Sequence, residues 1–348
     1  MSEGGKRSTM TEVESDGRTS GLPRLLGRSG RAASAGGRGM SVQQFLRSYG
    51  VLVALILLVV IATLLSDRFL SLPNLLNISR QIAIVGVLAI GMTFVIITAG
   101  IDLSVGSILA VVAVTTAEAV NAAGPTAGIL TALLVGGSLG LVNGLGVTLG
   151  GIQPFIMTVG MLAFARGLAF VFTGGSPVPT TDATFLQIGN GRTFGIPNPA
   201  LVFLVLLVVA WFVLKRTSFG RSVYAVGSND EAARLSGIRV RLVRASVYVI
   251  SGLCAGVAGL LYASQLGVGT PVAGEMFELD AIAATVVGGT SLFGGQGAIS
   301  GTFMGAALLG ILSNILNLTG VDPFIQRLFR GVLIWVAVML QRKDAKGR

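Results

Sequence analysis

Few residues of this chain could do chemistry, and Asp102 is the most conspicuous of them. It lies in the polar interruption 98–107 of an apolar run that otherwise extends from Ile82 to Val114. A carboxylate at membrane depth is costly unless it caps a helix, pairs with another group or faces water. Asp102 or Ser104 could satisfy the free amide groups where a helix restarts, or could hydrogen-bond a polyol that crosses the bilayer. We favour the cap, because freed backbone groups in lipid need partners whatever the protein does.

A second polar interruption lies in the C-terminal half, at residues 288–297, and contains Thr290 and Ser291. It also separates two apolar segments. A pair of such interruptions, one in each half of the chain, is typical of the discontinuous helices that surround a transporter's binding site. We therefore expect two broken or re-entrant helices, and we count both interruptions as parts of a candidate translocation path.

The second interruption matches a phosphate-binding loop only in part. Gly289 and Gly294 have the spacing of that motif, but Gly295 and Gln296 stand where lysine and then serine or threonine are required. No lysine elsewhere in the chain completes the motif. We therefore expect no cofactor on this chain, and any ATP and Mg²⁺ that drive it must be bound by a separate subunit.

Several other polar residues are predicted to lie at membrane depth. Each could line a cavity, but we expect interhelical hydrogen bonds to be the commoner role. They are Asn143, Gln153, Thr158, Asn314 and Asn317. The candidate translocation path then comprises Asp102, Ser104, Asn143, Gln153, Thr158, Thr290, Ser291 and Asn314.

The composition is that of an integral membrane protein. Of the 348 residues, 52% are hydrophobic and 11% are charged, and the mean hydropathy is +0.82, whereas about 25% of the residues in soluble domains are charged. The chain has no histidine and a single cysteine, Cys254. A histidine-based metal site, a Ser-His-Asp triad and an intrachain disulfide are thereby excluded, and we expect neither an enzyme nor a metal site.

The segment 215–244 is the one polar stretch between apolar spans that is typical of contact with a soluble partner. Asn229 is a good N-cap, and two acidic residues follow it where a helix N-terminus favours negative charge. Gly237 can adopt the left-handed conformation that ends a helix. The pattern predicts a self-contained helix of about two turns from Asn229 to Ser236.

The elements that position these residues are predicted to be an all-α, polytopic transmembrane helical bundle of about ten spans, since each crossing needs roughly 20 apolar residues. Six candidate spans precede the polar segment, at 49–65, 80–99, 101–120, 126–149, 153–173 and 199–214. Four follow it, at 245–266, 278–290, 298–318 and 324–340. The span 278–290 is too short and too rich in glycine to be complete.

The distribution of basic residues predicts the orientation. Of 25 lysines and arginines, eight lie in the N-terminal tail, seven in 215–244 and four at the C-terminus. By the positive-inside rule these three segments are cytoplasmic, and the even number of crossings between them agrees. The loops on the opposite side are then 66–79, 121–125 and 174–198.

This topology gives three regions: a tail at 1–48, a transmembrane domain at 49–341 that contains the polar segment 215–244, and a C-terminal tail at 342–348. The N-terminal tail lacks hydrophobic periodicity and is predicted to be disordered. Its basic residues could bind anionic lipid or nucleic acid. We expect instead that they form the charged flank that orients a membrane protein, with membrane lipid as a partner and no nucleic acid. The first apolar run begins too late for a signal peptide.

Five segments resemble the monosaccharide permeases of the ribose and xylose type among ATP-binding-cassette importers. In the polar segment, the residues that resemble the family's ATPase-coupling loop are Gly227, Asn229, Glu231, Ala232, Ala233, Ser236 and Gly237. The other matching segments are Gly100–Gly106, Gln153–Thr158 with Gly174–Val178, Glu278–Ala284 with Val287–Leu292, and Asn314–Gly320. The resemblance covers about residues 50–341, and the long N-terminal tail departs from it.

Membership of this family would imply a bacterial inner-membrane complex. The permease would form a homodimer, and a cytoplasmic subunit with two nucleotide-binding domains in one chain would hydrolyse ATP. An extracytoplasmic binding protein would deliver a small sugar, with pentoses first, and transport would be import by alternating access.

Two other functions stay open on the residues alone. A secondary carrier driven by a proton or sodium gradient would use Asp102 and the broken helices. A passive channel would also explain the glycine-rich interruptions. Both alternatives leave the polar segment 215–244 without a function.

Overall fold

The computed structural model describes residues 42–322, 324–326, 328–329, 331–332, 335 and 339. The chain divides into two compact units, Met1–Val42 and Gln43–Arg348, and only Val42 of the first unit is described. The predicted C-terminal tail, nearly all of the predicted N-terminal tail and much of the predicted span 324–340 therefore lie outside the described residues. Within those residues, α1 (Val42–Leu65) begins inside the predicted N-terminal tail.

The described residues confirm the predicted all-α membrane bundle. Seven of their helices are long and apolar enough to cross a membrane. They are α2 (Leu72–Ile97), α3 (Val105–Ala123), α4 (Pro125–Thr148), α5 (Pro154–Thr173), α7 (Asn198–Arg216), α10 (Val240–Leu266) and α12 (Ile299–Leu318). The apolar part of α1 is shorter, at Gly50–Leu65, and α11 (Phe277–Val287) is too short to span alone, as predicted for 278–290.

The predicted start of the second span is wrong. The segment 66–79 was expected to be a loop, but α2 begins at Leu72, with Ser71 as its N-cap and a proline in its first turn. Proline is well placed there, because the first turn of a helix has no use for its missing N–H. Polar side chains in the first turns of α2 lower its hydropathy and so hid the start of the helix.

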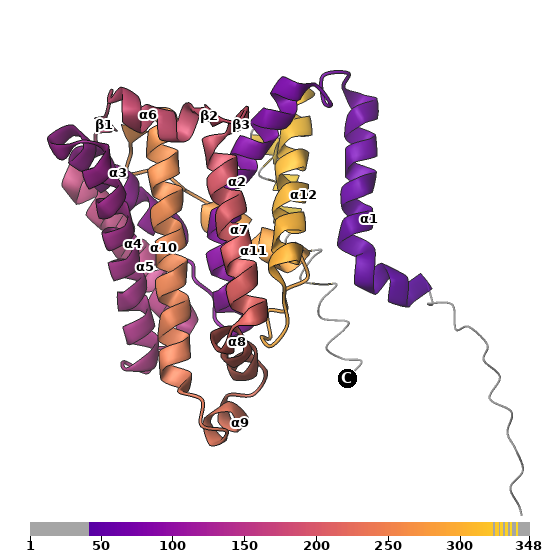
Figure 1. The fold of residues 1–348 in the computed structure, drawn as a ribbon, viewed down its shortest axis with the longest axis vertical. Helices are drawn as coiled ribbons and strands as arrows, with labels where there is room; N and C mark the ends of the chain where they lie inside the picture. Colours follow the sequence, from indigo (N-terminus) through magenta and orange to yellow (C-terminus); the bar gives the residue numbers. More distant parts are fainter. Residues whose placement is uncertain are drawn as a thin grey trace, which may run out of the picture. The chain divides into compact units, whose positions relative to one another are not determined.

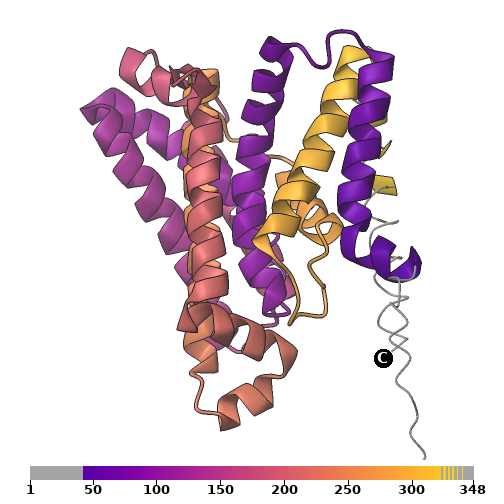
Figure 2. The same ribbon diagram turned by 45° about the vertical axis from the view of Figure 1, so that its right-hand side comes forward.

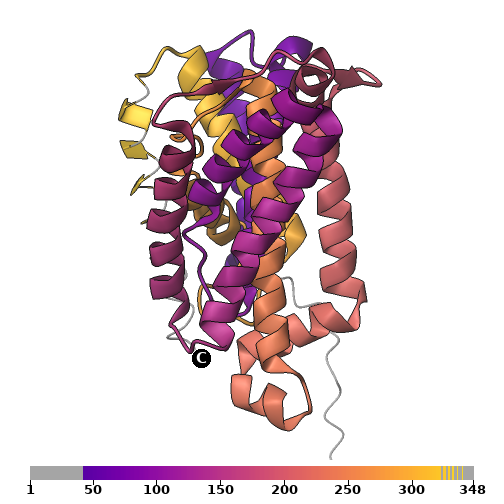
Figure 3. The ribbon, with the colours of Figure 1, turned by 90° about the vertical axis from the view of Figure 1, so that its left-hand side faces the viewer.

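The centre of the bundle is formed by α2 and α10. The two helices pack against each other, and α10 also packs against α3 and, most extensively, against α4. In turn, α2 contacts α7, α11 and α12, and nearly every residue from Ala83 to Ile97 is buried. Figure 2 shows α12 between α2 and α1, and Figure 3 shows α4 alongside α10.

The two ends of the bundle carry different structures (Figure 1). At one end, which we call the coupling end, α8 (Ser218–Ser228) and α9 (Asp230–Leu235) connect α7 to α10. At the other, the β end, β1 (Val178–Pro179) pairs with β4 (Val268–Gly269), and β2 (Arg192–Thr193) pairs with β3 (Ile196–Pro197), both antiparallel. The helix α6 (Ala183–Asn190) lies between β1 and β2 in the chain.

Glycines allow α4 and α10 to approach closely. A Cβ atom on Gly136 would lie 2.5 Å from the carbonyl oxygen of Gly252 and 2.8 Å from the Cα atom of Gly256. Gly140 faces Gly252 in the same way, with a Cβ atom 2.9 Å from its Cα atom. Close backbone contact replaces the hydrophobic effect as a source of stability between helices in lipid, so this contact fixes the position of α10.

We predict that Gly136→Ala lowers the thermal stability of the purified protein in detergent, because the added methyl group must push α10 away. Overpacking of this kind costs about 1–3 kcal/mol. Gly160→Ala in α5 is the matched control, because nothing lies within 4 Å of the added Cβ atom. The control should melt no lower than wild type, since alanine favours a helix over glycine by about 1 kcal/mol. Equal melting temperatures for the two variants would contradict the close packing.

Candidate functional site

The short helix α9 forms as the sequence predicts. The Asn229 side chain accepts a hydrogen bond from the amide of Ala232 at 2.9 Å, which is an N-cap. Two acidic residues occupy the first turn. Gly237, with φ of +82°, ends the helix in the left-handed conformation. The predicted self-contained helix is therefore confirmed, with bounds Asp230–Leu235.

A second helix precedes it, and the description of 215–244 as a single short helix in a loop is wrong in this respect. In α8, Thr217 is the N-cap and accepts a hydrogen bond from the amide of Gly220 at 3.2 Å. Val223 and Val226 are buried. The sequence did contain this signal, because apolar residues recur at helical spacing behind a threonine, but the surrounding polar residues obscured it.

The helix α9 has an exposed surface, and an ion pair attaches the helix to α10. An ion pair joins Asp230 to Arg244 of α10, with a distance of 3.0 Å between Oδ2 and Nη2. Arg234 donates hydrogen bonds to Glu231, and these bonds hold the pKa of the carboxyl group below its ordinary value. Leu235 is 75% exposed although it is apolar. Leu235 and the ionised side chains of α9 are therefore the groups that this end of the bundle offers to a partner.

The end of α2, the second polar interruption and α8 meet at one point, which we call the glycine junction: Ile97, Gly227 and Gly295. The amide of Gly295 donates to the carbonyl oxygen of Ile97 at 2.9 Å. Gly227 packs so closely on both that a Cβ atom there would collide with the Ile97 oxygen and lie 2.7 Å from the Gly295 nitrogen. Close by, the Tyr224 hydroxyl donates to the carbonyl oxygen of Gly297 at 2.7 Å. The helix that leads to α9 therefore contacts the end of α2 and the segment 288–298, which we call the second break.

The segment 98–104, the first break, is organised by the buried carboxylate of Asp102. Its Oδ1 atom accepts from the Ser104 amide at 3.0 Å and from the Ser104 hydroxyl at 2.6 Å. Its Oδ2 atom accepts from the Ser251 hydroxyl of α10 at 2.7 Å. The Asn143 amide of α4 donates to Ser104 Oγ at 2.8 Å. Asp102 therefore satisfies the amide of Ser104, the residue just before α3, although no side chain that the structure describes caps the amides of the helix itself. Its network also joins this segment to α10 and, through Ser104, to α4.

Two polar atoms in this network have no hydrogen-bond partner among the described residues. They are Oδ1 of Asn143 and the hydroxyl oxygen of Tyr248, and both atoms are buried. Thr158 of α5 donates to the carbonyl oxygen of Ile101 at 3.2 Å and so joins the first break from another side. Buried polar atoms without protein partners are typical of places where water or a polar ligand binds.

The helices α3 and α11 approach each other where they begin. Gly106, in the first turn of α3, lies against the carbonyl oxygen of Gly274 in the segment that leads into α11. Arg166 of α5 donates to the carbonyl oxygens of Pro271 and Ala273, at 2.6 and 2.8 Å, and so fixes that segment. The predicted interruptions are found where the chain leaves α2 at Ile97 and restarts in α3 at Val105, and where it leaves α11 at Val287 and restarts in α12 at Ile299.

The remaining predicted path residues lie apart from Asp102. Asn314 of α12 and Asn74 of α2 exchange amide hydrogen bonds of 2.8 and 3.0 Å, the interhelical bonding that we expected. Gln153 is exposed as the N-cap of α5. Thr290 is fully buried in the second break, and Ser291 forms a turn there. A role for any of these residues in the translocation path stays a prediction.

Three contributors to the site were missed from the sequence: Ser251, Tyr248 and the backbone of Ile97. Ser251 and Tyr248 lie in an apolar stretch of α10 with nothing to distinguish them from packing residues, and a backbone oxygen leaves no trace in a sequence. Among the described residues, no group of three or more acidic, cysteine or histidine side chains could hold a metal ion.

Discontinuous helices around a polar network, with a short exposed helix at one end, define the membrane subunit of a transporter. Sequence comparison agrees with this class. The family described as "Branched-chain amino acid transport system / permease component" matches residues 74–338. This chain belongs to that family of permeases.

Its curated relatives include ribose permeases. The ribose import permease protein of Bacillus subtilis is 44% identical over 303 residues, which cover 86% of this chain and 94% of the relative. That of Escherichia coli K12 is 41% identical over 312 residues, 88% and 97% of the two chains. The D-allose transport system permease protein of E. coli K12 is 37% identical over 305 residues, 87% and 94% of the two chains. No solved structure matches.

We predict that Asp102→Ala lowers the melting temperature of the protein in detergent, because the Ser104 amide and the Ser251 hydroxyl lose their acceptor in a buried place. Each unsatisfied group costs about 1–3 kcal/mol. The control is Asp102→Asn, which keeps one oxygen for Ser104 and can donate its amide to Ser251, and it should melt close to wild type. If the asparagine variant melts as low as the alanine variant, the role of Asp102 as the hydrogen-bond partner of Ser104 and Ser251 is wrong.

Proposed function

We propose that this chain is the permease subunit of an ATP-binding-cassette importer that moves a monosaccharide, with a ribose-like pentose first, into the cytoplasm. The observation that carries the proposal is the direct contact of α8 at the glycine junction with the end of α2, where the first break begins, and with the second break. The helices α8 and α9 project from the bundle, and α8 leads directly to the discontinuous helices. A displacement of α9 by a partner could therefore be transmitted through α8 to the candidate translocation path.

The relatives support the substrate class. Permeases named for ribose are 41–44% identical to this chain over most of its length, and the D-allose permease is 37% identical. Each of these three relatives is matched over at least 94% of its length. A pentose is therefore the first sugar to test, and a hexose such as allose the second.

The partners follow from the proposed class. A separate cytoplasmic ATPase would bind ATP and Mg²⁺, because this chain has no phosphate-binding loop. The family resemblance implies that its two nucleotide-binding domains lie in one chain. Its docking surface would be α9, with Leu235 at the centre. A second copy of the permease would complete the membrane part, and an extracytoplasmic sugar-binding protein would dock at the β end.

The orientation follows from charge. Seven basic residues lie in 215–244 at the coupling end, so the positive-inside rule puts that end, with both chain termini, in the cytoplasm. The β end would then face the outside of a bacterial inner membrane. Closure of the ATPase would push α9, α8 would carry the displacement to the glycine junction, and both breaks would move together to change which side of the path is open.

A gradient-driven carrier is the alternative that one observation favours, because Asp102 is a buried carboxylate in the core of the bundle. A gradient-driven carrier would leave α9 and its exposed Leu235 without a function. An importer uses both features, since Asp102 then organises the first break and α9 binds the ATPase.

We predict that Leu235→Asp abolishes co-purification of the ATPase and ATP-driven uptake while membrane insertion stays normal. Removing one apolar anchor and adding a charge weakens such an interface about tenfold or more. Ala232→Arg, also on the exposed side of α9, should act in the same direction. Leu235→Met keeps the apolar side chain and is the matched control.

The measurement is affinity purification of the tagged permease from its native membrane in mild detergent, with the associated chains identified by mass spectrometry. Wild type and Leu235→Met should recover an ATPase with complete nucleotide-binding motifs. Recovery of that ATPase in full with Leu235→Asp would overturn the docking surface, and repeated purification of wild type alone would favour the carrier.

A further inference from the structure

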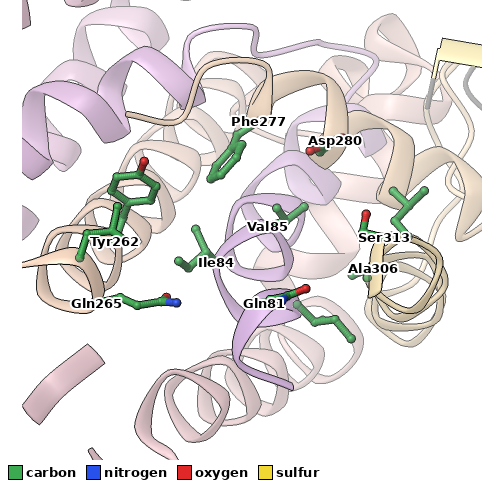
Figure 4. A pocket seen from close by; sticks show the side chains of 13 residues that line it. Gln81, Ile84, Val85, Tyr262, Gln265, Phe277, Asp280, Ala306 and Ser313 are labelled. Atoms are coloured by element: carbon green, nitrogen blue, oxygen red, sulfur yellow. The ribbon is translucent and has the colours of Figure 1, made fainter. Parts of the chain in front are cut away.

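A cavity of about 270 Å³ lies among α2, α10, α11 and α12, apart from the Asp102 network and the glycine junction. At about 30 Å³ per water molecule, this volume holds a monosaccharide together with a few waters. Figure 4 shows its labelled side chains arranged around a common space, with Ile84 and Val85 of α2 between Gln265 on one side and Ser313 on the other.

The cavity belongs to the β end of the bundle. Gln265 is next to the last residue of α10, and its carbonyl oxygen accepts a hydrogen bond at 3.0 Å from Asn190 of α6. Gln81 lies in the first half of α2, far from the glycine junction at the other end of that helix. The cavity is thus on the side from which the proposed binding protein would deliver sugar, and opposite to the ATPase.

Four helices each supply a hydrogen-bonding side chain to its wall. They are Gln81 from α2, Gln265 from α10, Asp280 from α11 and Ser313 from α12. The Oε1 atom of Gln265 is buried and has no hydrogen-bond partner among the described residues. Leaving an acceptor without a partner in a buried place is unfavourable, so this atom is suited to a hydroxyl donor that comes and goes.

The rest of the wall is apolar and partly aromatic. Tyr262 and Phe277 pack edge to face, with ring centroids 6.2 Å apart and planes at 75°. Aliphatic side chains, among them Ile84 and Leu309, complete the lining. A sugar ring has hydroxyl groups around its edge and C–H groups on its faces, so amides and a carboxylate beside aromatic and aliphatic groups match both of its surfaces.

We infer that this cavity is a transit site for a single monosaccharide inside the permease, with Gln81 and Gln265 as hydrogen-bonding residues for its hydroxyl groups. The inference rests on the proposed function. Few polar groups in a largely apolar wall give weak binding, which suits transport, because a transported molecule must leave as readily as it enters.

The test uses the whole transporter, with ATPase and binding protein, in proteoliposomes that are given D-ribose. Gln265→Leu and Gln81→Leu keep the approximate size of the side chain but remove its hydrogen bonds. The number of ribose molecules carried per ATP hydrolysed should fall about three- to tenfold, the loss expected for one or two hydrogen bonds. ATP hydrolysis stimulated by the binding protein should stay within about twofold, since neither residue touches α8 or α9.

The matched control is Gln187→Leu, the same change on an exposed residue of α6 at the same end but outside the cavity. It should carry as much ribose per ATP as wild type. A second measurement uses Gln265→Cys in a chain whose own cysteine, Cys254, is buried. A water-soluble thiol reagent should modify the thiol of the Gln265→Cys variant more slowly while the transporter carries ribose than while it is at rest.

The outcomes separate the two claims. If wild type carries ribose and the two leucine variants carry it equally well per ATP, with no protection of position 265 by ribose, the transit site is overturned and the proposed function stands. If the wild-type complex carries neither ribose nor allose, the proposed function falls, and the transit site falls with it.

Discussion

The backbone hydrogen bond from Gly295 to Ile97, with Gly227 packed against both residues, is the contact on which the account of this protein depends. It brings together three segments that are far apart in the sequence: the end of α2, the second break and the end of α8. Main-chain groups make the contact, and Gly227 contributes no side chain that could adjust. Such a junction transmits displacement well, because a packed core moves between discrete arrangements and does not deform continuously.

The surrounding lipid explains the rest of the site. Every backbone group freed by a helix break must find a partner inside the protein. At the first break the partner is the Asp102 carboxylate, and Ser251 and Ser104 complete its hydrogen bonds. Glycine contacts between α4 and α10 hold the helix that supplies Ser251. The network near Asp102 therefore ties the first break to α10 and, through Ser104, to α4, and the cavity at the β end lies beyond it.

The sequence predicted the features that local chemistry determines. Helical class, the two interruptions and the cap at Asn229 all follow from hydropathy or from the need of a helix end for a partner. The start of α2 at Leu72 and the helix α8 were missed, because polar residues within helices resemble loops. The contacts of Ser251, Tyr248 and Gly227 could not be predicted, since they depend on how helices distant in sequence pack together. The cavity was missed for the same reason, as its polar side chains come from four different helices.

The most direct test of the central claim is transport by Gly227→Ala in the complete transporter, compared with Gly160→Ala. The methyl group at 227 has no space against Ile97 and Gly295, whereas the one at 160 lies in the open. We expect that the Gly227→Ala permease still inserts and still binds its ATPase through α9, but loses most ATP-driven sugar uptake. Uptake equal to that of the control, with the ATPase bound normally, would contradict the transmission of movement through the glycine junction.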